Sequence, residues 1–263
     1  MAQNFRQKEI LDLARQHGKV VVEDLAAHFD VTVQTIRRDL TELCEAGELT
    51  RVYGGAILRS GVANIGYEDR RGLMAEEKDA IARACARAIP DDASLFLNIG
   101  TTTEAVARAL LSHRNLMVVT NNINVANILS ANESCEVVVA GGVMRRPDGG
   151  LVGDVTLEIV KHFKVDFAVI GASALDVEGD LLDFDFREVR VSQAILRQAR
   201  RAYLVADHSK FSRSAPVRIA SLEDIDTFFT DAPPPEPVRR LCRDWGTEIE
   251  PASAEEAAGR RTG

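Results

Sequence analysis

The sequence predicts an α/β protein in two parts, a small helical unit closed by a hairpin and a larger unit built on a mostly parallel sheet. Within residues 1–58, three apolar patterns at helical spacing precede two short extended runs around Gly54 and Gly55. From residue 76 onward, short apolar runs alternate with helical stretches, which is typical of a mostly parallel α/β sheet. The length of 263 residues provides enough apolar mass for both cores.

The first part, residues 1–58, is expected to be a winged helix-turn-helix. Thr32 is expected to cap the third helix, with Ile36, Leu40 and Leu43 on the inner face of that helix. An extended run on each side of the glycine pair predicts the hairpin that forms the wing. The three predicted helices cover about residues 4–16, a short segment around Leu25, and the segment that Thr32 starts and Gly47 ends.

The second part is expected to span residues 76–251. Residues 59–75 before it lack an apolar period and mix glycines with charges, which is typical of an exposed connector. Residues 252–263 after it are small and charged, and we expect them to be disordered. The predicted strands cover residues 94–97, 116–120, 136–140, 166–170, 202–206 and 227–229, and the predicted helices cover residues 76–89, 104–111, 123–129, 156–163 and 189–199.

Composition and motifs exclude several classes of protein. The N-terminus lacks a basic segment followed by an apolar one, and no run of about 18 apolar residues occurs, so we expect a cytoplasmic protein without a membrane partner. The four cysteines form no C-x-x-C pair and the five histidines are scattered, so neither a disulfide framework nor a metal site is predicted. No P-loop and no G-x-G-x-x-G motif follows a strand, and no cofactor is expected.

The net charge of −8 is unfavourable for a protein that binds nucleic acid, but the charge is unevenly distributed. Residues 1–60 carry 8 Lys+Arg and 9 Asp+Glu, so most of the negative charge lies beyond them. Any contact with DNA phosphates is therefore expected to use a local basic patch. The candidates for that patch are Arg37, Arg38, Arg51 and Arg59.

The third helix carries residue types that suit DNA recognition. Arginine can pair with guanine or phosphate, glutamine with adenine, and threonine with a phosphate or a thymine methyl group. Wing residues of the hairpin suit the DNA backbone or the minor groove. Two adjacent arginines on a helix also fit a plain solvated face. The candidate DNA-binding residues are Thr32, Gln34, Thr35, Arg37, Arg38, Arg51 and Tyr53, and Asp39 is expected on the same exposed surface.

The run IRRDL at residues 36–40, with Val31 and Thr32 before it and Gly-Gly-Ala at residues 54–56 after it, resembles the signature of the DeoR family of bacterial repressors. The likeness extends to E-x-L-A at residues 23–26 and to R-x-x-GGA at residues 51–56. It implies a repressor that binds double-stranded operator DNA. Two positions depart from the family pattern, because no Ser or Thr caps the second helix near Val21 or Val22, and Tyr53 replaces the usual His.

A second candidate site follows the predicted strand at residues 94–97. Gly100 and the three threonines after it stand at the start of a helix, where free N–H groups and the helix dipole attract an anion such as a phosphate. Threonines in this position also fit plain helix caps. Polar or glycine pairs follow other strand ends, where open α/β sheets gather their ligands. The candidate effector-binding residues are Gly100, Thr101, Thr102, Thr103, Asn121, Asn122, Gly141, Gly142, Arg146, Asp183, Glu188 and Lys210.

The same family resemblance covers this second part. It implies a sensor domain similar in fold to ribose phosphate isomerases, with a phosphorylated sugar or polyol as its ligand. The runs LFLNIGTTTEAVARALL, AGGVMRRPDGGLVG and TDAPPP look most like those of family members that respond to glycerol-3-phosphate, which implies this inducer. Another sugar phosphate is the alternative. Asn98 stands where an acidic residue is usual in the family.

An isomerase is the alternative function for such a fold. That chemistry would need a carboxylate and a lysine as general base groups on a sugar phosphate. Residues 179–190, GDLLDFDFREVR, retain Arg187 and Glu188 but contain no lysine and no glycine run. We therefore expect no enzyme activity, because a function is argued from the residues of a site and not from the fold.

The predicted mechanism is a switch operated by a metabolite. A homo-oligomer, either a dimer or a tetramer, is expected to place paired recognition helices in successive half-sites of the major groove. The phosphorylated ligand then favours an arrangement in which the helices no longer match the spacing of the half-sites. By linkage, bound DNA weakens ligand binding by the same factor.

Overall fold

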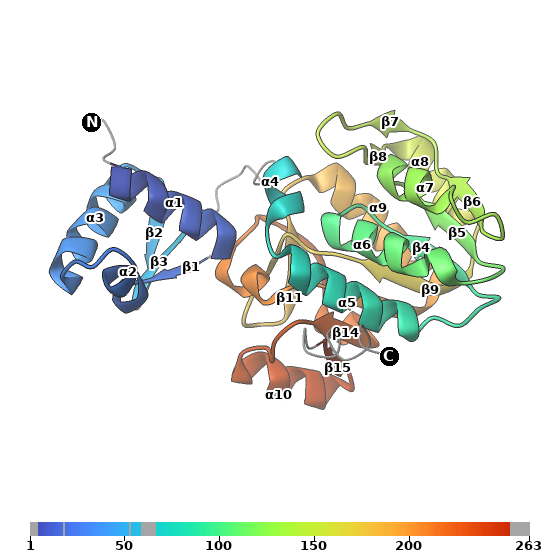
Figure 1. The fold of residues 1–263 in the computed structure, drawn as a ribbon. Helices are drawn as coiled ribbons and strands as arrows, with labels where there is room; N and C mark the ends of the chain where they lie inside the picture. Colours follow the sequence, from blue (N-terminus) through green and yellow to red (C-terminus); the bar gives the residue numbers. More distant parts are fainter. Residues whose placement is uncertain (1–4, 18, 53, 59–66, 253–263) are drawn as a thin grey trace, which may run out of the picture.

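The computed structural model describes residues 5–17, 19–52, 54–58 and 67–252. Figure 1 shows two bodies, a smaller one within residues 5–58, which we call the headpiece, and a larger one of residues 67–252, which we call the sensor body. No helix in these ranges is both long and apolar enough to cross a membrane.

The headpiece combines three helices with a small antiparallel sheet. Its elements are α1 (Phe5–His17), β1 (Lys19–Val21), α2 (Val22–His28), α3 (Val33–Glu45), β2 (Leu49–Val52) and β3 (Gly55–Leu58). The strands pair in the order β1-β3-β2, and the apolar faces of the helices meet in one core that contains Ile10, Ile36 and Leu40. The predicted winged helix-turn-helix is confirmed, although β1, which pairs with the wing, was not predicted.

Different contacts start the second and third helices. Thr32 caps α3, because its hydroxyl accepts a hydrogen bond from the backbone N–H of Thr35 at 3.2 Å. The equivalent residue before α2 is Val21, which makes no side-chain cap. Instead, the backbone N–H of Val22 donates to the carbonyl of Gly54 at 2.9 Å. The turn of the wing thus supplies the partner that the missing cap does not.

Gly55 is the position in the wing where a side chain is tolerated least. A Cβ built there would lie 1.9 Å from the carbonyl oxygen of Val20 on the neighbouring strand. Gly55→Ala is therefore expected to lower the free energy of unfolding of the headpiece by about 3 kcal/mol, because backbone must move. Gly54→Ala is the control, since its φ is +76° but the added Cβ meets nothing within 4 Å. Thermal unfolding of the two variants measures the difference, and equal stabilities would contradict this account.

The sensor body is built on a seven-stranded parallel sheet. Its strands are β4 (Ser94–Leu97), β5 (Met117–Thr120), β6 (Glu136–Val139), β9 (Val165–Ile170), β12 (Ala199–Val205), β14 (Thr227–Thr230) and β15 (Glu248–Pro251). They are arranged in the order β15-β14-β12-β9-β4-β5-β6, with every pair parallel. The predicted parallel sheet is confirmed, and only its edge strand β15 was missed.

Helices cover both faces of this sheet (Figure 1). They are α5 (Ala75–Arg87), α6 (Thr101–Ala109), α7 (Ile123–Leu129), α8 (Asp154–Lys161), α9 (Phe186–Arg197) and α10 (Glu236–Trp245). Along β4, Leu95 and Leu97 pack in a cluster with α5, α6 and α7, whereas Phe96 packs in the opposite cluster with α8, α9 and α10. Burial on both faces explains why these strands are continuous apolar runs in the sequence.

Several parts of the sensor body differ from the sequence prediction. Within the expected exposed connector, α4 (Tyr67–Gly72) forms a helix and Leu73 is buried. Helix α6 begins at Thr101, three residues before its predicted start. Ala252 is buried, and the rest of the predicted tail lies outside the described residues. The elements that were not predicted also include α10 and the short strands β7 (Val143–Met144), β8 (Leu151–Val152), β10 (Ala174–Leu175), β11 (Asp180–Asp183) and β13 (Val217–Ser221).

Candidate DNA-binding surface and effector pocket

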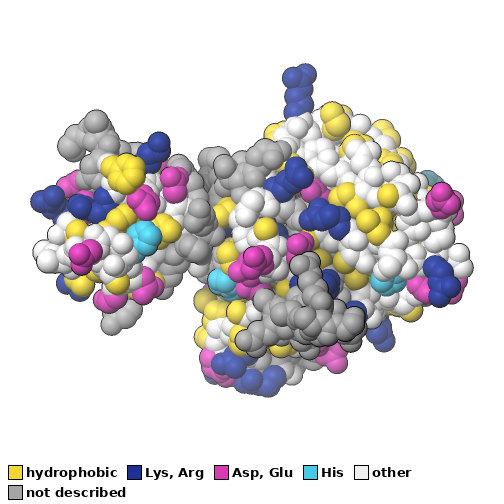
Figure 2. Space-filling view, in the orientation of Figure 1, with side chains coloured by type: hydrophobic (Ala, Val, Ile, Leu, Met, Phe, Trp, Pro, Cys, Tyr) yellow, Lys and Arg dark blue, Asp and Glu magenta, His cyan; other side chains and the backbone are white. Residues whose placement is uncertain are grey.

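The candidate DNA-binding side chains gather on the outer face of α3 and on the adjoining strand β2. Arg51 on β2 lies close to α3, because its positive charge lowers the pKa of the Cys44 thiol on that helix and so opposes the rise that burial causes. Figure 2 shows basic and acidic side chains mixed over the headpiece, so the basic surface is local. Tyr53 lies outside the described residues. Thr32, Gln34, Arg37, Arg38 and Arg51 are exposed, and Thr35 is half-buried.

The expectation that Asp39 lies on the exposed surface of α3 is wrong. Its carboxylate is fully buried and lies 2.5 Å from Nε of Arg6 on α1. The position lies three residues after the buried Ile36, on the same side of the helix, so the ion pair joins α1 to α3. Arg38 is 72% exposed and lies 3.6 Å from Glu42, a loose pair from which a DNA phosphate can displace it.

A polar pocket, which we call the α6 pocket, lies where β4 ends and α6 begins. Its free volume is about 40 Å³, which leaves room for a few water molecules. Seven of the twelve predicted effector-binding residues line it, and they come from the loop after β4, the start of α6, the end of β11, the start of α9 and a short 3-10 helix after β12. The lining residues are Arg70, Ile99, Gly100, Thr101, Thr102, Thr103, Gly171, Ala172, Ser173, Asp183, Glu188, Val205 and Lys210.

The first turn of α6 offers backbone donors to this pocket. Gly100 precedes the helix with a φ of +149°, and no described side chain caps the helix. The first N–H groups of α6 therefore have no partner within the helix and carry the positive end of its dipole. The hydroxyl of Thr103 donates to the carbonyl of Asn98 at 2.7 Å and so holds the loop. The hydroxyl of Thr101 makes only a 3.5 Å contact with the carbonyl of Arg70, which leaves it available to a ligand.

Buried lysines surround the same turn with positive charge. Lys210 lies in the short 3-10 helix His208–Ser212, and its Nζ is 3.7 Å from Oδ2 of Asp207. Burial, only partly offset by Asp207, lowers the pKa of Lys210 to about 8. Burial and the charge of Lys210 lower the pKa of Lys78 on α5 to about 7. An anion bound nearby would relieve this repulsion and raise both pKa values.

Two carboxylates also line the pocket. Asp183 on β11 accepts hydrogen bonds from the hydroxyl of Ser173 at 3.1 Å and from the backbone N–H of Phe184 at 2.6 Å. Burial raises the pKa of Asp183. Glu188, in the first turn of α9, forms an ion pair with Arg145. Carboxylates accept hydrogen bonds from hydroxyl groups, so one pocket combines donors for a phosphate with acceptors for a polyol.

The other five predicted effector-binding residues do not reach this pocket. Both asparagines are buried and used within the chain, because Asn121 donates to the carbonyl of Leu151 at 3.2 Å and Asn122 caps α7. The glycine pair after β6 leads into the hairpin of β7 and β8, in which β7 is exposed and β8 is buried, and the arginine of that hairpin faces solvent. The polar groups at the ends of β5 and β6 are thus used in contacts with loops of this chain and do not line the α6 pocket. These five residues are Asn121, Asn122, Gly141, Gly142 and Arg146.

Two polar residues of the pocket were missed from the sequence. Arg70 belongs to α4, whose sequence has no apolar period and gave no signal. Ser173 lies just beyond the carboxyl end of β9, and this position was a signal that could have found it. The departure at Asn98 is structural, because its amide donates to the hydroxyl of Ser192 at 2.6 Å and its oxygen accepts from the N–H of Ile99.

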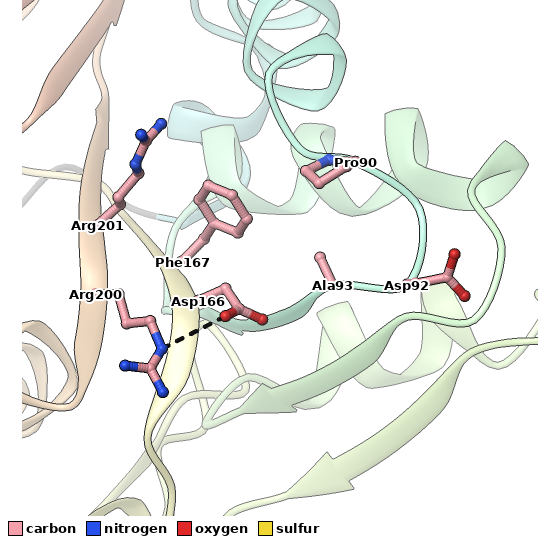
Figure 3. A pocket seen from close by; sticks show the side chains of 7 residues that line it. All are labelled: Pro90, Asp92, Ala93, Asp166, Phe167, Arg200 and Arg201. Atoms are coloured by element: carbon pink, nitrogen blue, oxygen red, sulfur yellow. Dashed lines mark ion pairs between the residues drawn. The ribbon is translucent and has the colours of Figure 1, made fainter.

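A larger cavity, of about 400 Å³, lies at the opposite ends of the strands (Figure 3). Pro90, Asp92 and Ala93 line it just before β4, and Asp166 and Arg200 line it from β9 and β12. Asp166 accepts from the hydroxyl of Ser94 at 2.6 Å and pairs with Arg200 at 3.6 Å. The charges of Asp166 and Arg200 in this cavity are therefore paired within the chain. This cavity also lies at the amino ends of a parallel sheet, where such sheets rarely bind ligands.

Two known protein domains match parts of this chain. The DeoR-like helix-turn-helix domain matches residues 6–61, and the DeoR C terminal sensor domain matches residues 73–232. The chain is 46% identical over 250 residues to the glycerol-3-phosphate regulon repressor of Escherichia coli (strain K12), which covers 95% of this chain and 99% of that protein. It is 46% identical over 230 residues to the protein of the same name from Haemophilus influenzae, covering 88% of this chain and 90% of that one.

Two further similarities were found. The HTH-type transcriptional repressor CsqR of Escherichia coli is 40% identical over 246 residues, which cover 94% of each chain. Among solved structures, ribose 5 phosphate isomerase A from Neisseria gonorrhoeae is similar with a TM-score of 0.37 and 13% identity, over 54% of each chain.

The three relatives named above are all named as repressors, and this chain matches a DeoR-like helix-turn-helix domain followed by a DeoR C terminal sensor domain. The chain therefore belongs to the DeoR family, as a transcriptional repressor.

Proposed function

We propose that this chain represses genes of glycerol and glycerol-3-phosphate metabolism in the cytoplasm, and that it leaves its operator when glycerol-3-phosphate binds in the α6 pocket. The observation that carries the proposal is the pairing of an uncapped helix N-terminus with the buried Lys210 in one pocket. Asp183 and Glu188 supply acceptors for the hydroxyl groups of a short polyol. The identity to the glycerol-3-phosphate regulon repressors supports this ligand. The alternative is another sugar phosphate, which the same chemistry would accept.

On the DNA side, we propose that α3 enters the major groove. The exposed Gln34 and Arg37 then meet base edges or phosphates, while Thr32 and Thr35 at the N-terminus of the helix approach the backbone. The wing strand β2 brings Arg51 beside the same groove.

The hydroxyl groups at the start of α6 provide a test of the phosphate site. Thr101→Val together with Thr102→Val removes two donors and keeps the size of the side chains. Because hydrogen bonds to a charged group are strong, glycerol-3-phosphate should bind about 100-fold more weakly, while operator binding stays within about twofold. Isothermal titration gives the first quantity and fluorescence anisotropy the second. If the variant binds the ligand as well as the unchanged chain does, these hydroxyls do not contact the phosphate.

We further propose that the chain works as a dimer or tetramer, because paired half-sites need paired recognition helices. The edge strand β6 pairs only with β5 among the described strands, and apolar side chains are exposed close to it. Figure 2 shows hydrophobic side chains on the sensor body in the region where Figure 1 labels β7 and α8. The apolar residues are Val139, Val143, Met144 and Val155, each at least 40% exposed.

A second copy of the chain is the expected occupant of this apolar surface. Val143→Glu with Val155→Glu should shift the protein to a smaller assembly, because a buried carboxylate at an interface is costly. Val177→Glu is the control, since Val177 is 60% exposed and lies outside this surface, between β10 and β11. Sedimentation equilibrium measures the mass, and an unchanged mass in the double variant would exclude this surface as the interface.

A further inference from the structure

We propose that Arg70 reports whether the α6 pocket is occupied: its guanidinium leaves Asp148 for the phosphate of the ligand, and helix α4 passes the change to the headpiece. This inference rests on the proposed function, since it assumes a phosphorylated ligand in the α6 pocket. The inference adds Arg70 and helix α4 as the connection between the sensor body and the headpiece.

The position of α4 in the chain makes it the first element after the wing. β3 ends at Leu58 and α4 begins at Tyr67, so eight residues join the headpiece to this helix. Figure 1 shows α4 on the side of the sensor body that faces the headpiece. A change in the position of α4 therefore moves the point at which the chain from the headpiece joins the sensor body.

The first turn of α4 is tied to the helix that forms the pocket. The hydroxyl of Tyr67 donates to Oε2 of Glu104 at 2.9 Å, and Glu104 directly follows the three threonines of α6. The side-chain amide of Asn124 donates to the Tyr67 hydroxyl at 3.0 Å and to the backbone carbonyl of Asp148 at 3.1 Å. One partly buried network of hydrogen bonds thus joins α4, α6 and the loop that carries Asp148.

The guanidinium of Arg70 is only partly used in this arrangement. Its Nη2 lies 3.5 Å from Oδ2 of Asp148, and the Arg70 side chain is 17% exposed. Its Nε is buried without a hydrogen-bond partner among the described residues. Because Arg70 also lines the α6 pocket, a phosphate there can take two of its N–H groups in the bidentate geometry that arginine prefers.

The carboxylate of Asp148 keeps other partners when its ion pair with Arg70 is broken. Arg145 lies 3.6 Å from the same carboxylate oxygen, and the backbone N–H of Gly150 donates to the other oxygen at 3.2 Å. Asp148 is only 3% exposed, so a carboxylate without partners would be costly there. The exchange of Arg70 between Asp148 and a phosphate is therefore possible without stranding a buried charge.

The far end of α4 is held in place. The buried ammonium of Lys78 on α5 donates to the backbone carbonyl of Leu73 at 2.5 Å and also to that of Arg70. This contact holds the C-terminal end of α4, so a change in the position of the helix would come at the Tyr67 end, through the hydrogen bonds of Tyr67 with Glu104 and Asn124. The small free volume of the pocket also indicates that a lining side chain changes position when the ligand binds. A three-carbon phosphate needs more room than a few water molecules, so it must displace such a side chain.

The experiment uses the full-length chain and an operator duplex that the unchanged protein selects from a random pool. Two quantities are measured for each variant: the Kd for glycerol-3-phosphate, and the release factor, which is the operator Kd with saturating glycerol-3-phosphate divided by the operator Kd without it. Tyr67→Phe should reduce the release factor at least about fivefold while the Kd for glycerol-3-phosphate changes less than about threefold, because the hydroxyl belongs to α4 and not to the pocket.

Asp148→Asn and Arg71→Gln complete the set. Asp148→Asn frees Arg70, so glycerol-3-phosphate should bind more tightly and the operator, without ligand, more weakly. Arg71→Gln is the control on the same helix, since Arg71 is exposed, and it should leave both quantities unchanged. Normal release factors in Tyr67→Phe and Asp148→Asn overturn this inference and leave the ligand assignment intact. An unchanged chain that does not bind glycerol-3-phosphate overturns the ligand assignment and this inference together.

Discussion

Replacing Arg37 and Arg38 together by alanine is expected to weaken operator binding about 100-fold and to lower the salt dependence of log K by up to about 2. Both side chains are exposed on the outer face of α3, and the only ion pair found for Arg38 among the described residues is the loose one with Glu42. The substitution leaves the core side of α3 unchanged. Fluorescence anisotropy with the operator over a range of salt concentrations measures both effects.

The matched control changes the same charge elsewhere. Arg83 and Arg87 are exposed on α5 of the sensor body, and their double alanine variant should leave the salt slope unchanged. The affinity for glycerol-3-phosphate should be the same in all three proteins, because the headpiece holds none of the pocket residues. If Arg37→Ala with Arg38→Ala binds the operator as tightly as this control, the two arginines form a plain solvated face.

Lys210→Met is expected to weaken glycerol-3-phosphate binding about 100-fold and so to leave the operator occupied at inducer concentrations that free it in the unchanged chain. The ammonium of Lys210 is buried beside the N-terminus of α6, where its attraction for a phosphate is poorly screened. Asp207, its partner, keeps hydrogen bonds from the backbone and hydroxyl of Ser209. Calorimetric titration measures the affinity, and thermal unfolding tests whether the sensor body stays folded.

The pH dependence of the unchanged chain gives a second readout of the same residue. Burial lowers the pKa of Lys210 to about 8, so its positive charge is present below pH 8 and is lost above it. A phosphate monoester stays doubly charged over this range, because its second pKa is about 6. The affinity for glycerol-3-phosphate should therefore fall from pH 7.5 to pH 9, and Lys210→Met should lose much of this dependence. Lys161→Met, at an exposed lysine of α8, is the control, and equal affinities in the two variants would remove Lys210 from the site.

The fold could be predicted where local pattern and tertiary structure agree. The strands buried on both faces are continuous apolar runs, so β4 was predicted with the same bounds and β5, β6, β9, β12 and β14 within a few residues. Elements held by long-range polar contacts could not be predicted. Helix α4 is held by polar contacts such as the hydrogen bond from Tyr67 to Glu104, and β15 has a polar sequence and pairs at the edge of the sheet, and neither element has an apolar period.

The same distinction applies to the candidate site. The start of α6 could be predicted, because a glycine and threonines between a strand and a helix form a local pattern. Arg70 could not, since only the tertiary fold brings α4 to the pocket. Asn121 and Asn122 stood at a strand end as expected, but nothing in the sequence shows that Leu151 and the backbone of α7 use their side chains. Position in a parallel sheet therefore predicted the edge of the sheet at which the candidate α6 pocket lies, whereas the residues that line this pocket depended on contacts between distant segments.

The measurement that tests this account most directly is the operator affinity of the full-length chain as glycerol-3-phosphate is added at fixed salt and pH 7.5. The account predicts that the operator Kd rises at least about tenfold to a plateau, and that added operator weakens glycerol-3-phosphate binding by the same factor. An operator Kd that stays constant with glycerol-3-phosphate but rises with another sugar phosphate would contradict the assigned ligand. A Kd that stays constant with every phosphate compound tested would contradict the switch itself.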